Sequence, residues 1–286
     1  MKTASSGAKD YSSSKNIANQ IYPLVEKTLP RTAHNWARKQ FFTPLKIKFR
    51  KKEVDFLKTA KLSFLPFKDE KIAIYEWGEG RTIILQHGWA GKGVQFIEFI
   101  KTLVEQKFHV VAIDSPAHGN STGKMTSAFE FAEVIKLVNK KYPNNYAHIG
   151  HSMGGLVLLN VLASDNYLNK VIIINTPTKS ESVMNAFLGI IGGSAKTAQF
   201  IFDFVFKNFQ VHFDDLFTPK ITPEASKKIL VIHDKKDKQV GVDTIEVTKK
   251  LLPHAQFYFT EGLGHTRILY DKKVIETIVG YLQKEP

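Results

Sequence analysis

The sequence predicts an α/β protein with a doubly wound, mostly parallel sheet of about eight strands. From residue 61 onward, short apolar runs alternate with segments of helical periodicity. That alternation is typical of βαβ units, which build parallel sheets covered by helices. The chain has 286 residues, 43% hydrophobic and 23% charged, which is enough for one large globular core.

The N-terminal part has a different character. Residues 1–15 are polar and Ser-rich, and we expect them to be disordered, whereas 16–42 has helical character punctuated by Pro23 and Pro30. A short amphipathic helix is predicted over 51–61. We therefore predict a basic, partly disordered and partly helical extension over residues 1–60, followed by the main domain over 61–286.

Eight apolar runs bounded by turns are predicted to be the strands. In chain order they cover residues 61–67, 71–77, 82–86, 108–113, 146–150, 171–174, 229–233 and 255–260. The helices predicted between and after them cover residues 94–106, 127–141 (capped by Thr126-Ser127), 152–163, 242–251 and 271–283. The alternation breaks between 177 and 228, where eight Phe residues predict a helical cap over about 178–227. Those rings could bind an apolar acyl or alkyl group, or only pack the cap onto the body.

A candidate nucleophile lies between a predicted strand and a predicted helix. Gly150-His151-Ser152-Met153-Gly154 matches G-x-S-x-G, in which a serine occupies a strained strand-to-helix turn. Small residues two positions to either side avoid clashes at such a turn, which explains Gly150 and Gly154. The following helix N-terminus stabilises negative charge. We predict that Ser152 is a nucleophile, because the motif lies between an apolar strand and an apolar helix. The competing interpretation, a nucleotide-binding turn, lacks its G-x-G-x-x-G spacing here.

Serine needs a base at neutral pH, and ligand sites in open parallel sheets form beyond the C-terminal strand ends. His265 follows the last predicted strand, whereas His254 precedes it and lies at the opposite edge. The orienting carboxylate is expected from the loop after strand 229–233, which offers Asp234 and Asp237. Asp237 lies deeper in the loop and is the preferred acid, with Asp234 kept as the alternative.

The strand at 82–86 ends in His87-Gly88-Trp89 at the same predicted edge. A backbone N–H there, together with that of Met153, could hold a carbonyl oxygen as it gains charge. We assign this oxyanion role to Trp89 and Met153, although the Trp89 ring can also serve core packing. His87, Gly88 and His151 support the turns.

Five motifs in this order resemble the α/β-hydrolase family, over about residues 72–282. They are His87-Gly88-Trp89, the run from Asp114 to Ser121, the run from Gly150 to Gly155, the run from His233 to Val240, and Gly264-His265. The order Ser, Asp, His is that of the family, so the resemblance implies a triad of Ser152, Asp237 and His265, with Asp114 forming a turn. Many members have Gly where Asp234 and Ala117 stand here, which keeps Asp234 open as the acid.

These features predict a serine hydrolase that cleaves a carboxylic ester of a small, partly apolar substrate through an acyl-enzyme, without metal or organic cofactor. Two alternatives stay open: a non-catalytic or sensory ligand-binding protein on this fold, and a thioesterase, amidase, lactonase or C–C bond hydrolase with the same triad. The sequence lacks a P-loop and an H-E-x-x-H motif. It also lacks cysteine, which excludes disulfides and thiolate chemistry.

Charge and hydropathy bear on partners and location. Residues 1–68 contain 15 Lys and Arg against 4 Asp and Glu, so most of the net charge of +13 lies there. We expect no nucleic-acid partner, because no nucleic-acid-binding module accompanies the charge. Weak contact of this region with anionic membranes is a second expectation. A cytoplasmic location is predicted, since neither a signal peptide nor a transmembrane run is evident.

Overall fold

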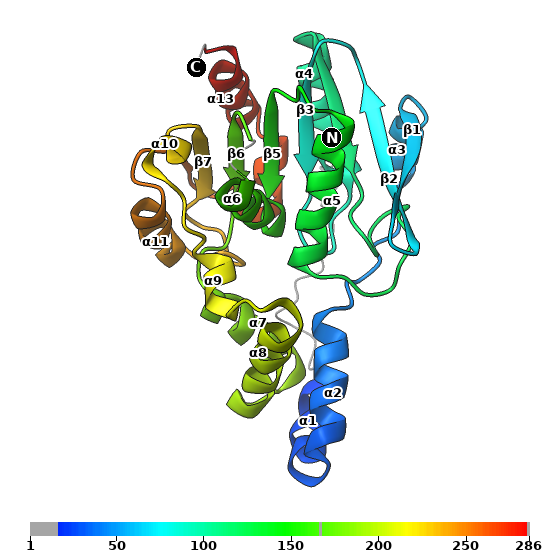
Figure 1. Cartoon of the computed structure of the whole chain (residues 1–286), viewed down its shortest axis with the longest axis vertical. Helices are drawn as coiled ribbons and strands as arrows, with labels where there is room; N and C mark the ends of the chain where they lie inside the picture. The colour runs from blue at the N-terminus through cyan, green and yellow to red at the C-terminus, as the bar shows by residue number, and fades with distance from the viewer. Residues whose placement is uncertain (1–16, 166–167, 285–286) are drawn as a thin grey trace, which may run out of the picture.

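The computed structural model describes residues 17–165 and 168–284, and in them an eight-stranded sheet forms (Figure 1). The strands are β1 (Lys61–Phe67), β2 (Glu70–Trp77), β3 (Arg81–Gln86), β4 (Phe108–Ile113), β5 (Ala147–His151), β6 (Val171–Ile174), β7 (Ile229–Asp234) and β8 (Gln256–Thr260). Each begins and ends within one residue of its predicted position. Their spatial order is β1-β2-β4-β3-β5-β6-β7-β8.

The sheet is parallel from β4 to β8, and only β2 runs antiparallel to its neighbours β1 and β4. Strands β3, β4 and β6 carry apolar runs that are buried on both faces, since helices cover both sides of the sheet there. The predicted doubly wound, mostly parallel fold is therefore confirmed. Because the parallel strands point the same way, the loops after β3, β5, β7 and β8 emerge at one edge of the sheet.

Alternate residues of each strand point to opposite faces of the sheet, so two cores form. Ile83 and Leu85 pack with α4 (Ile97–Glu105) and α13 (Lys272–Gln283) on one face. On the other face, Ile84 packs in the core formed by the second set of helices. These are α5 (Ala128–Lys141), α6 (Met153–Asp165) and α11 (Asp243–Leu251). The predicted helix over 94–106 begins as a short 3-10 turn, η1 (Gly93–Phe96), before α4.

A group of helices fills the interval between β6 and β7, in yellow-green to yellow in Figure 1. They are α7 (Ser180–Ile191), α8 (Ala195–Phe209), α9 (Phe213–Phe217) and α10 (Pro223–Ser226). Most of the aromatic side chains there pack against one another and against Phe42 and Phe129. The Phe-rich composition thus mainly serves packing of this layer.

The N-terminal helices are α1 (Ile17–Thr28), α2 (Pro30–Phe41) and α3 (Lys51–Leu57). Pro30 opens α2 as predicted, but Pro23 lies inside α1 without ending it. Helices α1 and α2 form a hairpin that packs on α7 and α8, where the Tyr22 and Thr197 hydroxyls are 2.8 Å apart. Residues 1–15, for which disorder is predicted, lie outside the part of the chain that the structure describes. The predicted domain boundaries stay predictions.

Within the described ranges, no helix is long and apolar enough to cross a membrane.

The last short elements are α12 (Gly264–Arg267) and η2 (Ile268–Tyr270), which connect β8 to α13.

Candidate active site

Ser152 occupies a strained turn between β5 and α6. Its φ angle is +54°, in the left-handed region that non-glycine residues seldom adopt. Its backbone N–H donates to Ile174 O at 2.8 Å, which ties the turn to β6. A Cβ at Gly154 would lie 2.3 Å from Gln86 O, and one at Gly150 would lie 2.6 Å from Gly155 N. The two glycines therefore permit this turn to approach β3 and to enter the helix.

His265 and Asp237 meet at the same edge, although 27 residues separate them in the chain. The Nδ1–H of His265 donates to Asp237 Oδ2 at 2.6 Å, and the Asp237 side chain is fully buried. Burial alone would raise the pKa of Asp237, but hydrogen bonds from His265 and from the backbone of Gln239 and Val240 outweigh it and lower that pKa. Asp237 is thus an ionised carboxylate that orients the imidazole.

Asp234 has a different environment. Its carboxylate accepts hydrogen bonds from the Thr260 hydroxyl and from the backbone N–H groups of Lys236, Gly262 and Leu263. Burial would raise the pKa of Asp234, but these bonds lower it. Among the described residues, no hydrogen bond joins Asp234 to the His265 ring. Asp234 therefore organises the loop between β8 and α12, and Asp237 is the carboxylate that contacts the His265 ring.

The turn after β3 lies directly against Ser152. A Cβ at Gly88 would come within 2.8 Å of Ser152 Cβ, so this position needs a glycine. Among the described residues, the N–H of Trp89 in this turn and that of Met153 at the start of α6 donate to no acceptor. These unpaired donors are available to an oxyanion, while the Trp89 ring packs edge-on against His118 at 5.5 Å.

Two neutral histidines shape that turn. The buried His87 ring accepts the N–H of Ser115 at 2.9 Å and donates to Gly88 O at 2.6 Å. His118 accepts the N–H of Ala90 at 2.9 Å. Burial lowers the pKa of His118 to about 4 and that of His87 well below its usual value. Both rings therefore stay uncharged and hold the backbone beside Trp89.

Two further residues link the loops. His151 donates through Nε2 to His265 O at 2.8 Å, and the two rings lie 4.7 Å apart. Asn175, after β6, donates to Gly264 O at 3.1 Å and accepts the N–H of Asp234 at 2.9 Å. The sequence interpretation included His151 as a support of the turn and quoted His118 within the run from Asp114 to Ser121 without giving it a role, and it missed Asn175. Asn175 directly follows the apolar strand β6 at the edge of the sheet where Ser152 and His265 lie, and that position was the available signal.

One pair of candidate residues remains to be described, Ser152 and His265. In the part of the chain that the structure describes, no hydrogen bond joins Ser152 Oγ to the His265 ring. Catalytic hydrogen bonds are often long in ligand-free enzymes and tighten with substrate. The structure thus brings Asp237 and His265 into contact, with His265 against His151, the residue preceding Ser152.

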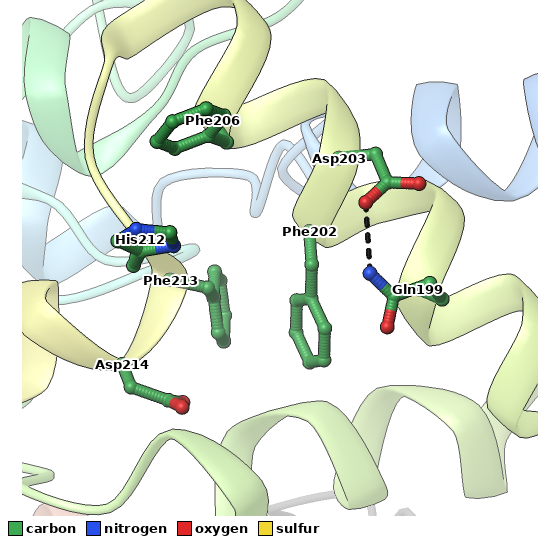
Figure 2. A pocket seen from close by; sticks show the side chains of 7 residues that line it. All are labelled: Gln199, Phe202, Asp203, Phe206, His212, Phe213 and Asp214. Atoms are coloured by element: carbon green, nitrogen blue, oxygen red, sulfur yellow. Dashed lines mark hydrogen bonds between the residues drawn. The ribbon is translucent and has the colours of Figure 1, made fainter.

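A pocket of about 280 Å³ lies elsewhere, between α8 and α9. Figure 2 shows its lining, with Phe202, Phe206 and Phe213 beside Asp203 and Asp214. None of Ser152, Asp237 and His265 lines it. It is therefore separate from the site described above.

Comparison with known proteins supports the fold assignment. The α/β-hydrolase fold family matches residues 81–192, which include Trp89, Ser152 and Asn175. A pimeloyl-[acyl-carrier protein] methyl ester esterase of Vibrio campbellii is 28% identical over 104 residues, 36% of this chain and 40% of that protein. A serine hydrolase-like protein of Danio rerio is 36% identical over 88 residues, 28% of this chain and 27% of that protein. The chain thus spans less than half the length of these curated relatives.

Among solved structures, an esterase from Exiguobacterium antarcticum superposes with a TM-score of 0.57 at 18% identity. The match covers 78% of this chain and all of the esterase. At that identity the likeness concerns the fold alone. Together with the family match over residues 81–192 and the strand order, it shows that the chain has the α/β-hydrolase fold.

Proposed function

We propose that this protein is a serine hydrolase that cleaves a carboxylic ester, or a related acyl bond, of a small and partly apolar substrate. The observation that carries the proposal is the convergence of Ser152, on its strained turn, with the buried Asp237–His265 pair at one edge of the sheet. The relatives whose names describe ester hydrolysis add support for this reaction class.

Each residue has a defined part in the proposed reaction. The His265 Nε2 takes the proton of Ser152 Oγ, and the oxygen attacks the substrate carbonyl. The N–H groups of Trp89 and Met153 hold the resulting oxyanion, each such donor typically contributing about 3 kcal/mol to lowering the barrier. His265 then gives its proton to the leaving alcohol, which departs as the acyl-enzyme forms. Asp237 keeps Nδ1 protonated throughout, so that Nε2 can accept a proton.

Deacylation follows the same steps with water. His265 takes a proton from the water, which attacks the acyl carbonyl and forms a second oxyanion. As this collapses, His265 returns the proton to Ser152 Oγ and the carboxylic acid leaves. The chain's own side chains thus supply every proton transfer in this scheme.

The test combines an active-site label with turnover. A fluorophosphonate probe should label the wild-type protein stoichiometrically and leave Ser152→Ala unlabelled, while urea unfolding shows that both are folded. Hydrolysis of p-nitrophenyl esters should fall by a factor of about 10³ or more in Ser152→Ala, since the nucleophile is lost. A series from acetate to decanoate would define the acyl preference. Ser164→Ala, on the far end of α6, is the matched control and should behave as wild type.

Absence of labelling in the folded wild-type protein would reject the enzyme proposal. It would favour the alternative of a ligand-binding protein that retains the fold. Labelling without ester turnover would instead direct the search to thioesters, amides or lactones.

A further inference from the structure

We infer that the outer face of the N-terminal helical hairpin is a docking surface for anionic lipid bilayers. The surface comprises the exposed side chains of α1, α2 and the segment that follows them, up to Lys48. It is independent of the proposed reaction, because no residue of the catalytic edge belongs to it.

The hairpin has two distinct faces. Its inner face is fixed to the cap, since Asn19 donates to Gly189 O at 2.7 Å and Tyr22 pairs with Thr197. Ala33 and Ala37 are buried on the same side of α2. The outer face of α1 is therefore set by positions three residues apart on the other side of the helix, Ile21 and Leu24.

That outer face is unusually apolar for a surface in water. Leu24 is 68% exposed, Leu29 at the hairpin tip 60%, and Ile21 50%. Trp36 is also exposed and its ring lies 5.6 Å from that of Tyr22, which places it beside α1. Leu45 and Ile47 continue the exposed apolar positions after α2. Exposed large apolar side chains scattered singly are ordinary, but this stretch of 27 residues holds six of them.

The charged residues of this surface have one sign. Basic side chains alternate with the apolar ones and are exposed at Lys27, Arg31, Lys39, Lys46 and Lys48. In residues 17–52 the single acidic residue is Glu26. Its carboxylate points inward, accepting hydrogen bonds from Ser194 and Thr197 at 2.6 Å each. No carboxylate of this segment therefore opposes the exposed lysines and arginines.

Apolar side chains interleaved with lysine and arginine match a bilayer interface with anionic headgroups. Nucleic acid would use the positive charges but leave Leu24 and Leu29 in water, so it fits the surface less well. The surface also reaches the catalytic edge, because Lys48 O accepts a hydrogen bond from Lys92, just beyond the oxyanion turn, at 3.2 Å. A bound bilayer would thus lie beside the edge at which an apolar substrate must enter.

The test is vesicle co-sedimentation of the full chain at 0.1 M salt. We expect binding to vesicles of phosphatidylcholine with 30% phosphatidylglycerol and at least tenfold weaker binding to phosphatidylcholine alone. Leu24→Ser with Leu29→Ser should weaken binding to the anionic vesicles at least tenfold, and Lys27→Gln with Arg31→Gln about thirtyfold. Trp36 fluorescence should shift to the blue on binding, and the shift should be absent in Trp36→Phe.

Matched controls separate this surface from general effects. Lys140→Gln with Lys141→Gln removes two basic residues on α5, and Val242→Ser removes an exposed apolar side chain elsewhere. Neither should change vesicle binding by more than about twofold, and all variants should keep the wild-type urea midpoint. Failure to bind anionic vesicles would overturn the inference. So would leucine substitutions without effect on vesicle binding, tighter binding to duplex DNA, or a dimer that Leu24→Ser disperses in the absence of vesicle binding.

Discussion

At the scale of single residues, the two candidate acids have been separated by their hydrogen bonds. Asp237 contacts the imidazole of His265 at 2.6 Å, whereas Asp234 accepts backbone N–H groups of the neighbouring loop. Sequence position narrowed the choice of acid to these two, because Asp234 ends β7 and Asp237 lies in the loop after it. Sequence position favoured Asp237 but could not exclude Asp234, since the outcome depends on how the loop folds back toward β8.

The distinction predicts different losses for the two asparagine variants. Asp237→Asn should lower kcat by a factor of about 10⁴, because an amide no longer fixes the productive imidazole tautomer. Asp234→Asn should lose about 1–3 kcal/mol of unfolding free energy, as buried N–H groups lose a charged acceptor, while its folded fraction keeps most of its activity. Ester turnover and urea unfolding measured on both variants check this. A larger kcat loss in Asp234→Asn would reverse the assignment.

At the scale of elements, the strands were predictable and their long-range partners were not. Apolar runs such as 171–174 are buried on both faces, so composition alone marks them as interior strands. The G-x-S-x-G turn was also predictable from local sequence, because the glycines on either side of Ser152 lie between an apolar strand and an apolar helix. Packing of α1 and α2 on α7 and α8, and the role of Asn175, depend on contacts far apart in the chain. Local periodicity carries no information about such pairings.

Helix α3 illustrates one of these long-range contacts. Lys92 Nζ lies 2.7 Å from Glu53 Oε2 in an ion pair whose side chains are only 7% and 3% exposed. Burial alone would raise the pKa of Glu53, but hydrogen bonds from Lys92 and Arg50 lower it. The pair thus joins the N-terminal region to the segment that follows the turn after β3.

Removing one partner should leave an uncompensated buried charge. We expect Glu53→Gln to cost about 3 kcal/mol of unfolding free energy, and the added substitution Lys92→Met to restore part of that loss. Glu276→Gln breaks an exposed pair with Lys272, whose side chain is 90% exposed, and should cost less than about 0.5 kcal/mol. Urea unfolding of the four proteins provides the measurement. Equal costs for Glu53→Gln and Glu276→Gln would contradict this account.

At the scale of the whole molecule, the four buried histidines with the most strongly lowered pKa values couple stability to pH, and His233, whose pKa burial also lowers, acts in the same direction. Burial lowers the pKa of His148 and of His151 to about 3 and that of His118 to about 4, and it places that of His87 well below its usual value. In the unfolded chain these groups take up protons near pH 6.5. Their contribution to stability is therefore fully present above pH 6.5 and is lost as the pH falls from there toward 4.

Below pH 6.5 each histidine should contribute at most about 1.4 kcal/mol per pH unit, and the four together at most about 5.6 kcal/mol per unit. Urea unfolding at pH 7.5, 6.0 and 5.0 should accordingly show a steep decline in unfolding free energy on acidification. His148→Gln should lower the slope by about one histidine's share, because the side chain that the folded state keeps neutral is gone. His212→Gln is the control, since that ring is exposed, and should leave the slope unchanged. A wild-type free energy that stays level from pH 7.5 to 5.0 would show that these rings titrate while folded.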